Sequence, residues 1–586
     1  MHRWVVESMA AHDFYRDLGG PPDLSDPDRE VRIGGYSQLS DPPLYYLFAS
    51  LPMRLLPERA VEVQLYAGRL VSLGFYLLAL LAACALVDEL AGPANPLRWT
   101  APVALALLPA FTDVMTAVNN DAGAIAAFSW FLWAAVRLVR RGFSVRDFVW
   151  CLAALALGIM LKRTAWIGAP LLPAVLLFSL LRGRQIRYAW GALALAAAVL
   201  LAGVFSWDGT AAWYTRPGSR VRLSPGEGAP APPLGRYVFR LEHSPGDLHP
   251  SPFQLLSQKS LSGLRGQTVT LGAWMWAAGE TGGEAPAAAR LELLTVRPEE
   301  RRYSQSMSLT NEPHFIAFWL DLPAGMDRAW ISLAPAAALE AELYLDGIVL
   351  VDGQRPLDQP PVFENDQALH GEWGGQPFTN LIRNASAERS WPQIRTWAEQ
   401  WGSRLFPDYG YDRPSLALYT LLDSPGAGGY YRTLGKVLLQ TFWAKFGWGH
   451  VPVAGRFSYP FLALFTLLGL SGALFALVRS ARIDIRCIPG ASLFFLGLAA
   501  AAVWGLTFVR GSNYLLVAPY YPVARYAYPA VIPTLLLLCS GWLEAARTFQ
   551  ARFRLPAWAG AGVVIAVFLV LDLLSVLSLQ SYYSAG

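Results

Sequence analysis

The chain has 586 residues, of which 54% are hydrophobic and only 15% are charged, and its formal net charge is +4. The arginines behind this charge lie in short loops rather than in a basic patch, and no nucleic-acid-binding motif occurs, which excludes nucleic acid as a partner. All four cysteines lie in apolar segments or at their ends, which excludes a disulfide framework and a cysteine-based metal site.

Apolar segments long enough to cross a membrane recur towards both ends of the chain. About 20 apolar residues in a helix span a hydrocarbon core of ~30 Å. Ten such segments are predicted as transmembrane helices: 63–87, 100–118, 122–139, 147–161, 165–181, 188–206, 457–478, 487–509, 526–543 and 557–578. Between 208 and 435 no comparable segment occurs, and Pro, Gly and charged residues become frequent. The sequence therefore predicts a polytopic α-helical membrane protein with one large domain inserted between two groups of helices.

The distribution of arginine predicts the orientation of these helices. If they alternate across the bilayer, the loops at 140–146, 182–187 and 479–486 share one side, which the positive-inside rule makes cytoplasmic. Nearly every candidate functional polar group then lies on the opposite, outer side. The expected organisation is an outer loop with interfacial helices (1–62), a first transmembrane block (63–207), an extracytoplasmic domain (208–435) and a second transmembrane block (436–586).

Short runs with a period of two residues follow one another between residues 235 and 353. They cover 237–241, 268–276, 289–296, 314–320, 329–333 and 342–351, and the alternation predicts an all-β sandwich. The pattern resembles the jelly-roll carbohydrate-binding modules, whose last strand often reads like Tyr344-Leu-Asp-Gly-Ile-Val-Leu350. Asn380–Asn384 resembles their opening strand. For tryptophans such as Trp274 and Trp319, core packing is the commoner role and sugar stacking is the alternative.

Polar residues gather at the predicted outer ends of the helices. Asp41-Pro-Pro-Leu-Tyr-Tyr46 starts an aromatic amphipathic stretch, and proline at a helix start suits a helix in the membrane interface. Asn119-Asn120-Asp121 and Lys162-Arg163 form the next two outer turns, and Ala524–Pro529 precedes a late helix. Because Lys162 and Arg163 break the positive-inside bias, a role in holding a lipid phosphate competes with simple snorkelling to the headgroups.

The order of these motifs, with a Phe-Trp-x-x-Phe-Gly-Trp segment at 442–448, resembles the GT-C superfamily of membrane glycosyltransferases. The resemblance covers both membrane blocks and is closest to an uncharacterised bacterial branch beside the protein mannosyltransferases and the aminoarabinose transferases. It implies transfer of a sugar from a polyprenyl-phosphate-linked donor to a glycan, lipid or protein acceptor. The reaction would take place on the outer face of the bacterial cytoplasmic membrane, with a divalent metal, Mg or Mn, as the one cofactor considered.

The resemblance and the outer turns together define a set of candidate site residues. The family's catalytic base is an acidic residue early in the first outer loop, and its position is expected to fall just before Met1. The remaining catalytic candidates are Asp41 and Asp121, and Asp121 is also the candidate metal ligand. The candidates for binding the donor phosphate are Lys162, Arg163 and Arg525. The candidates for contacting substrate are Tyr45, Tyr46, Asn119 and Asn120.

Non-catalytic explanations compete with each of these roles. A turn acid is more often structural than catalytic, Tyr45 and Tyr46 suit an aromatic belt, and Asp13 and Asp17 suit a solvated helix face. For the whole chain, the alternatives are a non-catalytic carbohydrate-binding or envelope-assembly membrane protein and a lipid or polysaccharide transporter. Transporters typically have internal repeats and polar helices that meet at the midplane. The sequence shows neither feature, so chemistry at the membrane edge is favoured.

Overall fold

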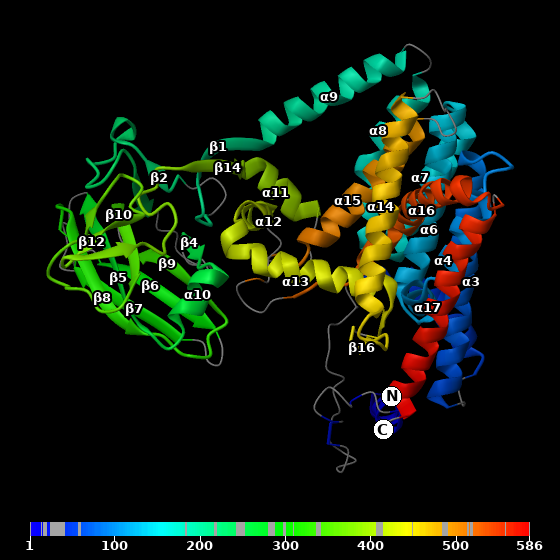
Figure 1. Ribbon diagram of the computed structural model, residues 1–586, viewed down its shortest axis with the longest axis horizontal. Coiled ribbons are helices and arrows are strands. Elements are labelled where there is room, and N and C mark those ends of the chain that lie inside the picture. Colours follow the sequence, from blue (N-terminus) through cyan, green and yellow to red (C-terminus); the bar gives the residue numbers. More distant parts are fainter. Residues whose placement is uncertain are drawn as a thin grey trace. The chain divides into compact units, whose positions relative to one another are not determined.

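The computed structural model describes residues 2–12, 15, 20, 22–23, 41–56, 60–181, 185–215, 220–241, 252–278, 288–296, 301–308, 310–335, 342–405, 414–447, 449–482, 490–512, 515, 520–556 and 558–584. The chain divides into two compact units, and many of their elements are labelled in Figure 1. The helical unit consists of Met1–Ala192, Leu434–Val509 and Tyr521–Gly586. The β unit consists of Leu193–Thr433 and Arg510–Tyr520. Asp13 and Asp17 lie outside the described residues.

The helical unit is built from long apolar helices. Its elements are α1 (His2–Ala11), α2 (Leu44–Arg54), α3 (Val61–Leu90), α4 (Leu97–Ala106), α5 (Pro109–Thr116), α6 (Asn120–Arg141), α7 (Val145–Leu161), the 3₁₀ helix η1 (Arg163–Leu171), α8 (Leu172–Leu180), α14 (Ser458–Arg482), α15 (Gly490–Val509), the 3₁₀ helix η4 (Ala524–Ala530), α16 (Val531–Phe553) and α17 (Ala559–Ser584). A short hairpin of β15 (Lys445–Phe446) and β16 (Val451–Pro452) accompanies them. Two further helices, α9 (Gln185–Val204) and α13 (Ser424–Trp443), contribute residues to both units.

Seven helical segments of the described chain are long and apolar enough to cross a membrane. The number rises to eight if α4 and α5, which meet at a bend of 60°, form one broken span. The membrane class predicted from the sequence is thereby confirmed. Each of the ten predicted segments overlaps one described helix or two consecutive ones, but neither α7, with 17 residues, nor α9 is among these seven or eight. The count of ten spans therefore stays a prediction.

Helix α6 is the buried centre of the helical unit, and different polar groups occupy its two ends. At its start, the side chain of Asn119 caps the helix by accepting a hydrogen bond from the backbone N–H of Ala122 at 3.2 Å. At its far end, Arg141 pairs with the buried carboxylate of Glu89 at 2.5 Å. A helix of 22 residues is about 33 Å long at 1.5 Å per residue, close to the thickness of a hydrocarbon core. The two polar ends are therefore about one membrane apart.

Helices α14 and α16 approach each other closely because glycines face one another. A Cβ added to Gly541 on α16 would lie 1.7 Å from the backbone oxygen of Gly469 on α14. A Cβ added to Gly472 would lie 2.2 Å from the oxygen of Gly541. Beside this contact, the Trp542 ring stacks on Phe465 with centroids 4.0 Å apart. Small residues at such an interface let two backbones pack directly, as is common in membrane helices.

The β unit contains two antiparallel sheets and several smaller elements, drawn mainly in green in Figure 1. The five-stranded sheet has the order β2 (Arg222–Leu223), β3 (Val238–Leu241), β10 (Glu342–Asp352), β5 (Thr268–Ala278) and β8 (His314–Asp321). The four-stranded sheet has the order β4 (Phe253–Leu255), β9 (Arg328–Pro335), β6 (Ala288–Val296) and β7 (Arg301–Ser308). The remaining elements are β1 (Phe205–Thr210), η2 (Pro225–Glu227), α10 (Gln258–Leu264), β11 (Val362–Phe363), β12 (His370–Trp373), β13 (Gln376–Thr379), β14 (Ser390–Ile394), α11 (Thr396–Leu405) and α12 (Pro414–Leu422).

The two sheets share one apolar core. Leu271 and Leu345 from the five-stranded sheet belong to the same buried cluster as Leu293 and Ile331 from the four-stranded sheet. All six runs predicted from period-two alternation are strands, so the predicted β-sheet region is confirmed. β7 was not predicted, because its sequence Arg-Arg-Tyr-Ser-Gln-Ser-Met-Ser is polar on nearly every position.

Two sequence expectations about the β unit differ from the structure. Asn380–Asn384 is not a strand. Instead, the Asn380 side chain joins neighbouring backbone segments through four hydrogen bonds. It accepts the N–H groups of Leu350 and Ile382 and donates to the carbonyls of Ile348 and Ala368, at 2.8–3.0 Å. The loop 510–520, expected in the second transmembrane block, belongs to the β unit, where Arg328 donates to the Leu515 carbonyl at 2.6 Å.

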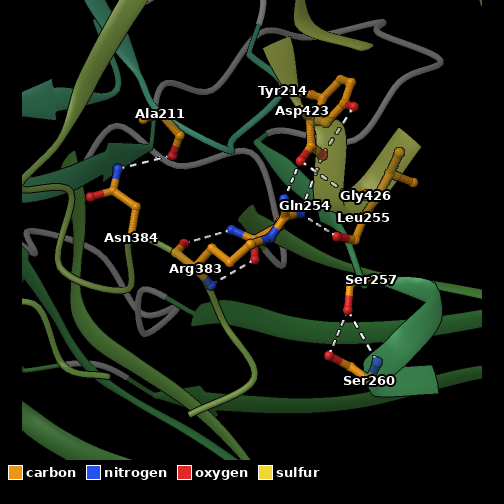
Figure 2. Close-up of polar contacts among 10 residues, drawn as sticks. All are labelled: Ala211, Tyr214, Gln254, Leu255, Ser257, Ser260, Arg383, Asn384, Asp423 and Gly426. Carbon is orange, nitrogen blue, oxygen red and sulfur yellow. Dashed lines mark hydrogen bonds and ion pairs between the residues drawn. The ribbon is translucent and has the colours of Figure 1, made fainter. Parts of the chain in front are cut away.

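A buried ion pair fastens the start of α13 to the β unit, as Figure 2 shows. Arg383 pairs with Asp423, which is fully buried, and also donates to the carbonyl of Leu255 at 2.5 Å. Asp423 accepts from the Gly426 backbone N–H at 3.1 Å and from the Tyr214 hydroxyl at 3.2 Å. Burial together with the Asp423 charge raises the pKa of Tyr214 well above its ordinary value, so this phenol stays a donor. The network satisfies both charges from within the chain.

The glycine contact between α14 and α16 makes a prediction about stability. Gly541→Ala forces the two backbones apart, and overpacking of this kind costs about 1–3 kcal/mol. We therefore expect a lower thermal unfolding temperature for the variant in detergent, measured by tryptophan fluorescence. The matched control is Gly497→Ala on α15, where an added Cβ meets no atom within 4 Å. Equal unfolding temperatures for the two variants would contradict the described packing.

Candidate functional site

A buried lysine and a buried aspartate form an ion pair at the start of α6. Asp121 lies in the first turn of α6, and Lys162 is the residue that directly follows α7. The Nζ of Lys162 donates to Oδ1 of Asp121 at 2.8 Å. Lys162 is only 8% exposed and Asp121 only 6%. The sequence placed these residues in separate outer turns, and the structure brings them into direct contact.

Local helix geometry explains why this pair forms where it does. A carboxylate in the first turn of a helix is stabilised by the positive end of the helix dipole, and a cation beyond the last turn by the negative end. Asp121 and Lys162 satisfy these two rules on α6 and α7, which are neighbours in the bundle. The backbone of Lys162 is extended, with φ −158° and ψ 133°, so α7 stops there and η1 begins one residue later. The ion pair and the two helix dipoles therefore stabilise the same placement of the two charges.

Asp41 is held beside this pair through Asn120. It lies shortly before α2, and its Oδ2 accepts a hydrogen bond from Nδ2 of Asn120 at 2.8 Å. Asn120 is buried and precedes Asp121 directly, whereas Asp41 is half-buried. Burial, followed by the charges of Asp41 and Asp121, raises the pKa of Tyr46 on α2 to about 12. The phenol of Tyr46 is therefore protonated and lies within electrostatic reach of both carboxylates.

Two of the predicted substrate contacts make supporting hydrogen bonds. Tyr45 is fully buried, and its hydroxyl lies 2.7 Å from the Ser72 hydroxyl, which donates to the Ala117 carbonyl at 2.8 Å. Asn119, besides capping α6, donates from Nδ2 to the Val114 carbonyl at 2.7 Å. These bonds fasten α2 to α3 and fix the turn before α6. We therefore propose no substrate contact for Tyr45 or Asn119.

A second cationic segment lies against α6 from a distant part of the chain. The 3₁₀ helix η4 packs on α6 and α15 and carries Arg525 and Tyr526. The guanidinium carbon of Arg525 lies 5.2 Å from the centre of the Tyr526 ring, and Nζ of Lys162 lies 5.9 Å from the same centre. Both distances suit cation–π contacts. The structure thus brings Arg525 into the neighbourhood of Lys162, whereas Arg163 is exposed at the start of η1.

Tyr526 is the site residue that the sequence did not single out. It lies in the Ala524–Pro529 segment, next to Arg525, but nothing in a sequence shows that its ring contacts two cations. The one feature of the sequence that points to Tyr526 is its position next to Arg525, an arginine outside the loops predicted to be cytoplasmic. We call Asp41, Asn120, Asp121, Lys162, Arg525 and Tyr526 the α6 cluster.

The α6 cluster does not suit a divalent metal. Mg²⁺ and Mn²⁺ prefer several oxygen ligands, but the Asp121 carboxylate already faces the ammonium group of Lys162. Among the residues that the structure describes, no three His, Cys, Asp or Glu side chains gather in a way that could hold a metal ion. We therefore assign no step to a metal, and the Mg or Mn expectation stays untested.

Parts of the chain are similar to known proteins. Residues 25–224 match a family model described as "Predicted membrane protein (DUF2142)". A solved structure titled "CBM4 structure and function" aligns with 20% of this chain and 70% of its own length, at 16% sequence identity and a TM-score of 0.16. No curated protein matches. The matched segment includes Asp41, Asp121 and Lys162.

The burial of the Lys162–Asp121 pair makes a prediction about stability. Lys162→Met leaves Asp121 charged without its partner, and breaking a buried pair in this way costs about 3–5 kcal/mol. Adding Asp121→Leu removes the second charge and should restore most of the lost stability. The measurement is the thermal unfolding temperature of the purified chain. A double variant that is less stable than Lys162→Met alone would contradict the assigned pairing.

Proposed function

We propose that the α6 cluster binds the phosphate of a polyprenyl-phosphate-linked sugar and transfers that sugar to an acceptor hydroxyl. The observation that carries the proposal is the buried Lys162–Asp121 pair at one end of the membrane helices, with Arg525 and a second acid beside it. A lipid-phosphate donor has its scissile bond at the same depth, where the hydrocarbon region meets the headgroups.

Burial of Lys162 argues against the simplest alternative role. A lysine that merely snorkels to the headgroups keeps its ammonium group in water. Lys162 is instead 8% exposed and directed at Asp121, and ionisable residues buried among membrane helices are costly and usually functional. Arg163, which is exposed, fits the snorkelling role. We therefore assign phosphate binding to Lys162 and Arg525 and not to Arg163.

The geometry suits stabilisation of a departing phosphate. An ammonium group has three N–H donors, and the bond to Asp121 uses one of them and fixes the direction of the side chain. A guanidinium group presents a planar fork that matches two phosphate oxygens. Positive charge that is already in place stabilises the negative charge that develops on the leaving group in the transition state. In this role Asp121 positions Lys162.

Asp41 is the better candidate for the general base within the described chain. One oxygen of Asp121 is already engaged by the ammonium group of Lys162. Asp41 is half-buried, and its Oδ2 accepts an amide hydrogen bond from Asn120. In the proposed step the acceptor oxygen bonds to the anomeric carbon while the bond from that carbon to the phosphate oxygen breaks. The phosphate leaves with the electron pair, and Asp41 takes the acceptor proton.

The proposal predicts how charge removal affects sugar transfer. The full-length chain is reconstituted in liposomes with tritiated polyprenyl-phosphate mannose or glucose and a mixture of glycan and lipid acceptors. The readout is the tritium that moves from donor to acceptor. The double variant Lys162→Met/Asp121→Leu, chosen because its stability should be near normal, is expected to lose transfer about 100-fold or more.

The matched control removes an ion pair between the same two helices at their other end. Arg137 on α6 pairs with Asp147 on α7 at 3.1 Å, so Arg137→Met/Asp147→Leu alters the same helix contact away from the α6 cluster. This variant should keep transfer near the wild-type rate. Wild-type chain that transfers no sugar from either donor, or equal rates for the two double variants, would overturn the proposal.

A further inference from the structure

The helix α11 begins at the point where the apolar helix α9 ends. Arg395, which precedes α11, donates its backbone N–H to the carbonyl of Val204, the last residue of α9, at 2.8 Å. Directly beyond α9, strand β1 pairs with β14, the strand that leads into α11, and Phe205 lies opposite Ile394. All of these residues belong to the β unit. The start of α11 is therefore fixed to the end of α9.

The C-terminal part of α9 is apolar and exposed on all sides. Residues 191–204 form a helix with no charged side chain, and Leu195, Val199, Leu200 and Leu201 are each more than half exposed. A helix that is apolar all round is stable in lipid or in a protein core. Because the chain is a membrane protein, lipid is the natural surrounding for this segment. The end of α9 then marks the depth at which the chain leaves the hydrocarbon.

Helix α11 has one packed face and one exposed face. On the packed face, both carboxylate oxygens of Glu399 accept hydrogen bonds from Ser415 of α12, at 2.9 and 2.8 Å. Gly402, one turn later, lies so close to Pro414 that an added Cβ would be 2.6 Å from its ring. On the exposed face stand Trp397, Trp401 and Arg404 at spacings of four and three residues.

The tryptophans of this face are not core residues. Trp397 is 51% exposed and Trp401 is 61% exposed. Trp207 on β1 is 74% exposed, and it lies in a β-bulge where two residues of β1 stand opposite Pro392. Proline has no N–H to complete the ladder, and a bulge turns a side chain outward. Three exposed indoles therefore lie within a few residues of the Val204–Arg395 contact.

We propose that α11 and the β1 bulge rest on the bilayer surface, with Trp397, Trp401 and Trp207 inserted at headgroup depth. Tryptophan concentrates at the membrane–water interface because its ring is apolar and its N–H is polar. Arg395 and Arg404 are exposed beside these rings and suit lipid phosphates. The surface anchors the base of the β unit to the membrane at the end of α9. The proposal stands independently of sugar transfer.

The test measures the depth of labels on α11 in the full-length chain reconstituted in liposomes. In a chain whose native cysteines are replaced by alanine, Trp397→Cys, Trp401→Cys and Gln400→Cys are each labelled with an NBD fluorophore. Gln400→Cys keeps both tryptophans, so the test does not depend on variants that lose them. We expect blue-shifted emission at all three positions and loss of most of it to lipids with a nitroxide at the headgroup.

The control label replaces Trp319 on β8, which is 48% exposed in the five-stranded sheet of the same unit. Trp319→Cys should give water-like emission that the nitroxide lipid leaves unchanged. Water-like, unquenched emission at positions 397, 400 and 401 would overturn the proposal. So would a response of the α11 labels to soluble oligosaccharides in place of the nitroxide lipid, because it would make the tryptophans a sugar-binding surface.

Discussion

The cost of placing a charge in a low-dielectric region governs the arrangement of the helical unit. Lys162 and Asp121 are both buried at the edge of the membrane helices, and neither charge would be stable there without the other. Their contact joins the start of α6 to the end of α7, and η1 begins at the residue after Lys162. Asp41 and Arg525 then lie near this pair, although they are more than 480 residues apart in the sequence.

The ion pair between Arg383 and Asp423 shows what a purely structural pair looks like. Asp423 and Arg383 are surrounded by groups that complete their hydrogen bonds, including the Gly426 N–H and the Leu255 carbonyl. The Lys162–Asp121 pair has a second acid and a second cation beside it instead. The Arg383–Asp423 pair fixes the start of α13. The α6 cluster instead contains charges of both signs at the depth where a lipid phosphate would lie. That contrast supports a binding role for the α6 cluster.

Sequence patterns predicted the elements of the fold better than they predicted its contacts. The apolar segments coincide with helices and the period-two runs with strands, because both patterns follow directly from which face is buried. The polar strand β7 and the hydrogen bonds of the Asn380 side chain were not predicted, because neither follows from an alternation of apolar and polar residues. In the same way, the sequence identified Asp121 and Lys162 as residues of two outer turns, but their pairing, the supporting roles of Tyr45 and Asn119, and the position of Tyr526 depend on tertiary packing.

The most direct test of the α6 cluster is to locate a bound lipid phosphate. The full-length chain in lipid nanodiscs is irradiated with polyprenyl phosphate that carries a diazirine on the isoprene unit next to the phosphate, and the attached peptides are identified by mass spectrometry. We expect attachment to the segments around Asp121, Lys162 and Arg525, and we expect this attachment to be lost when the diazirine lipid has no phosphate. Attachment spread over the lipid-facing helices, and equal for the two lipids, would contradict it.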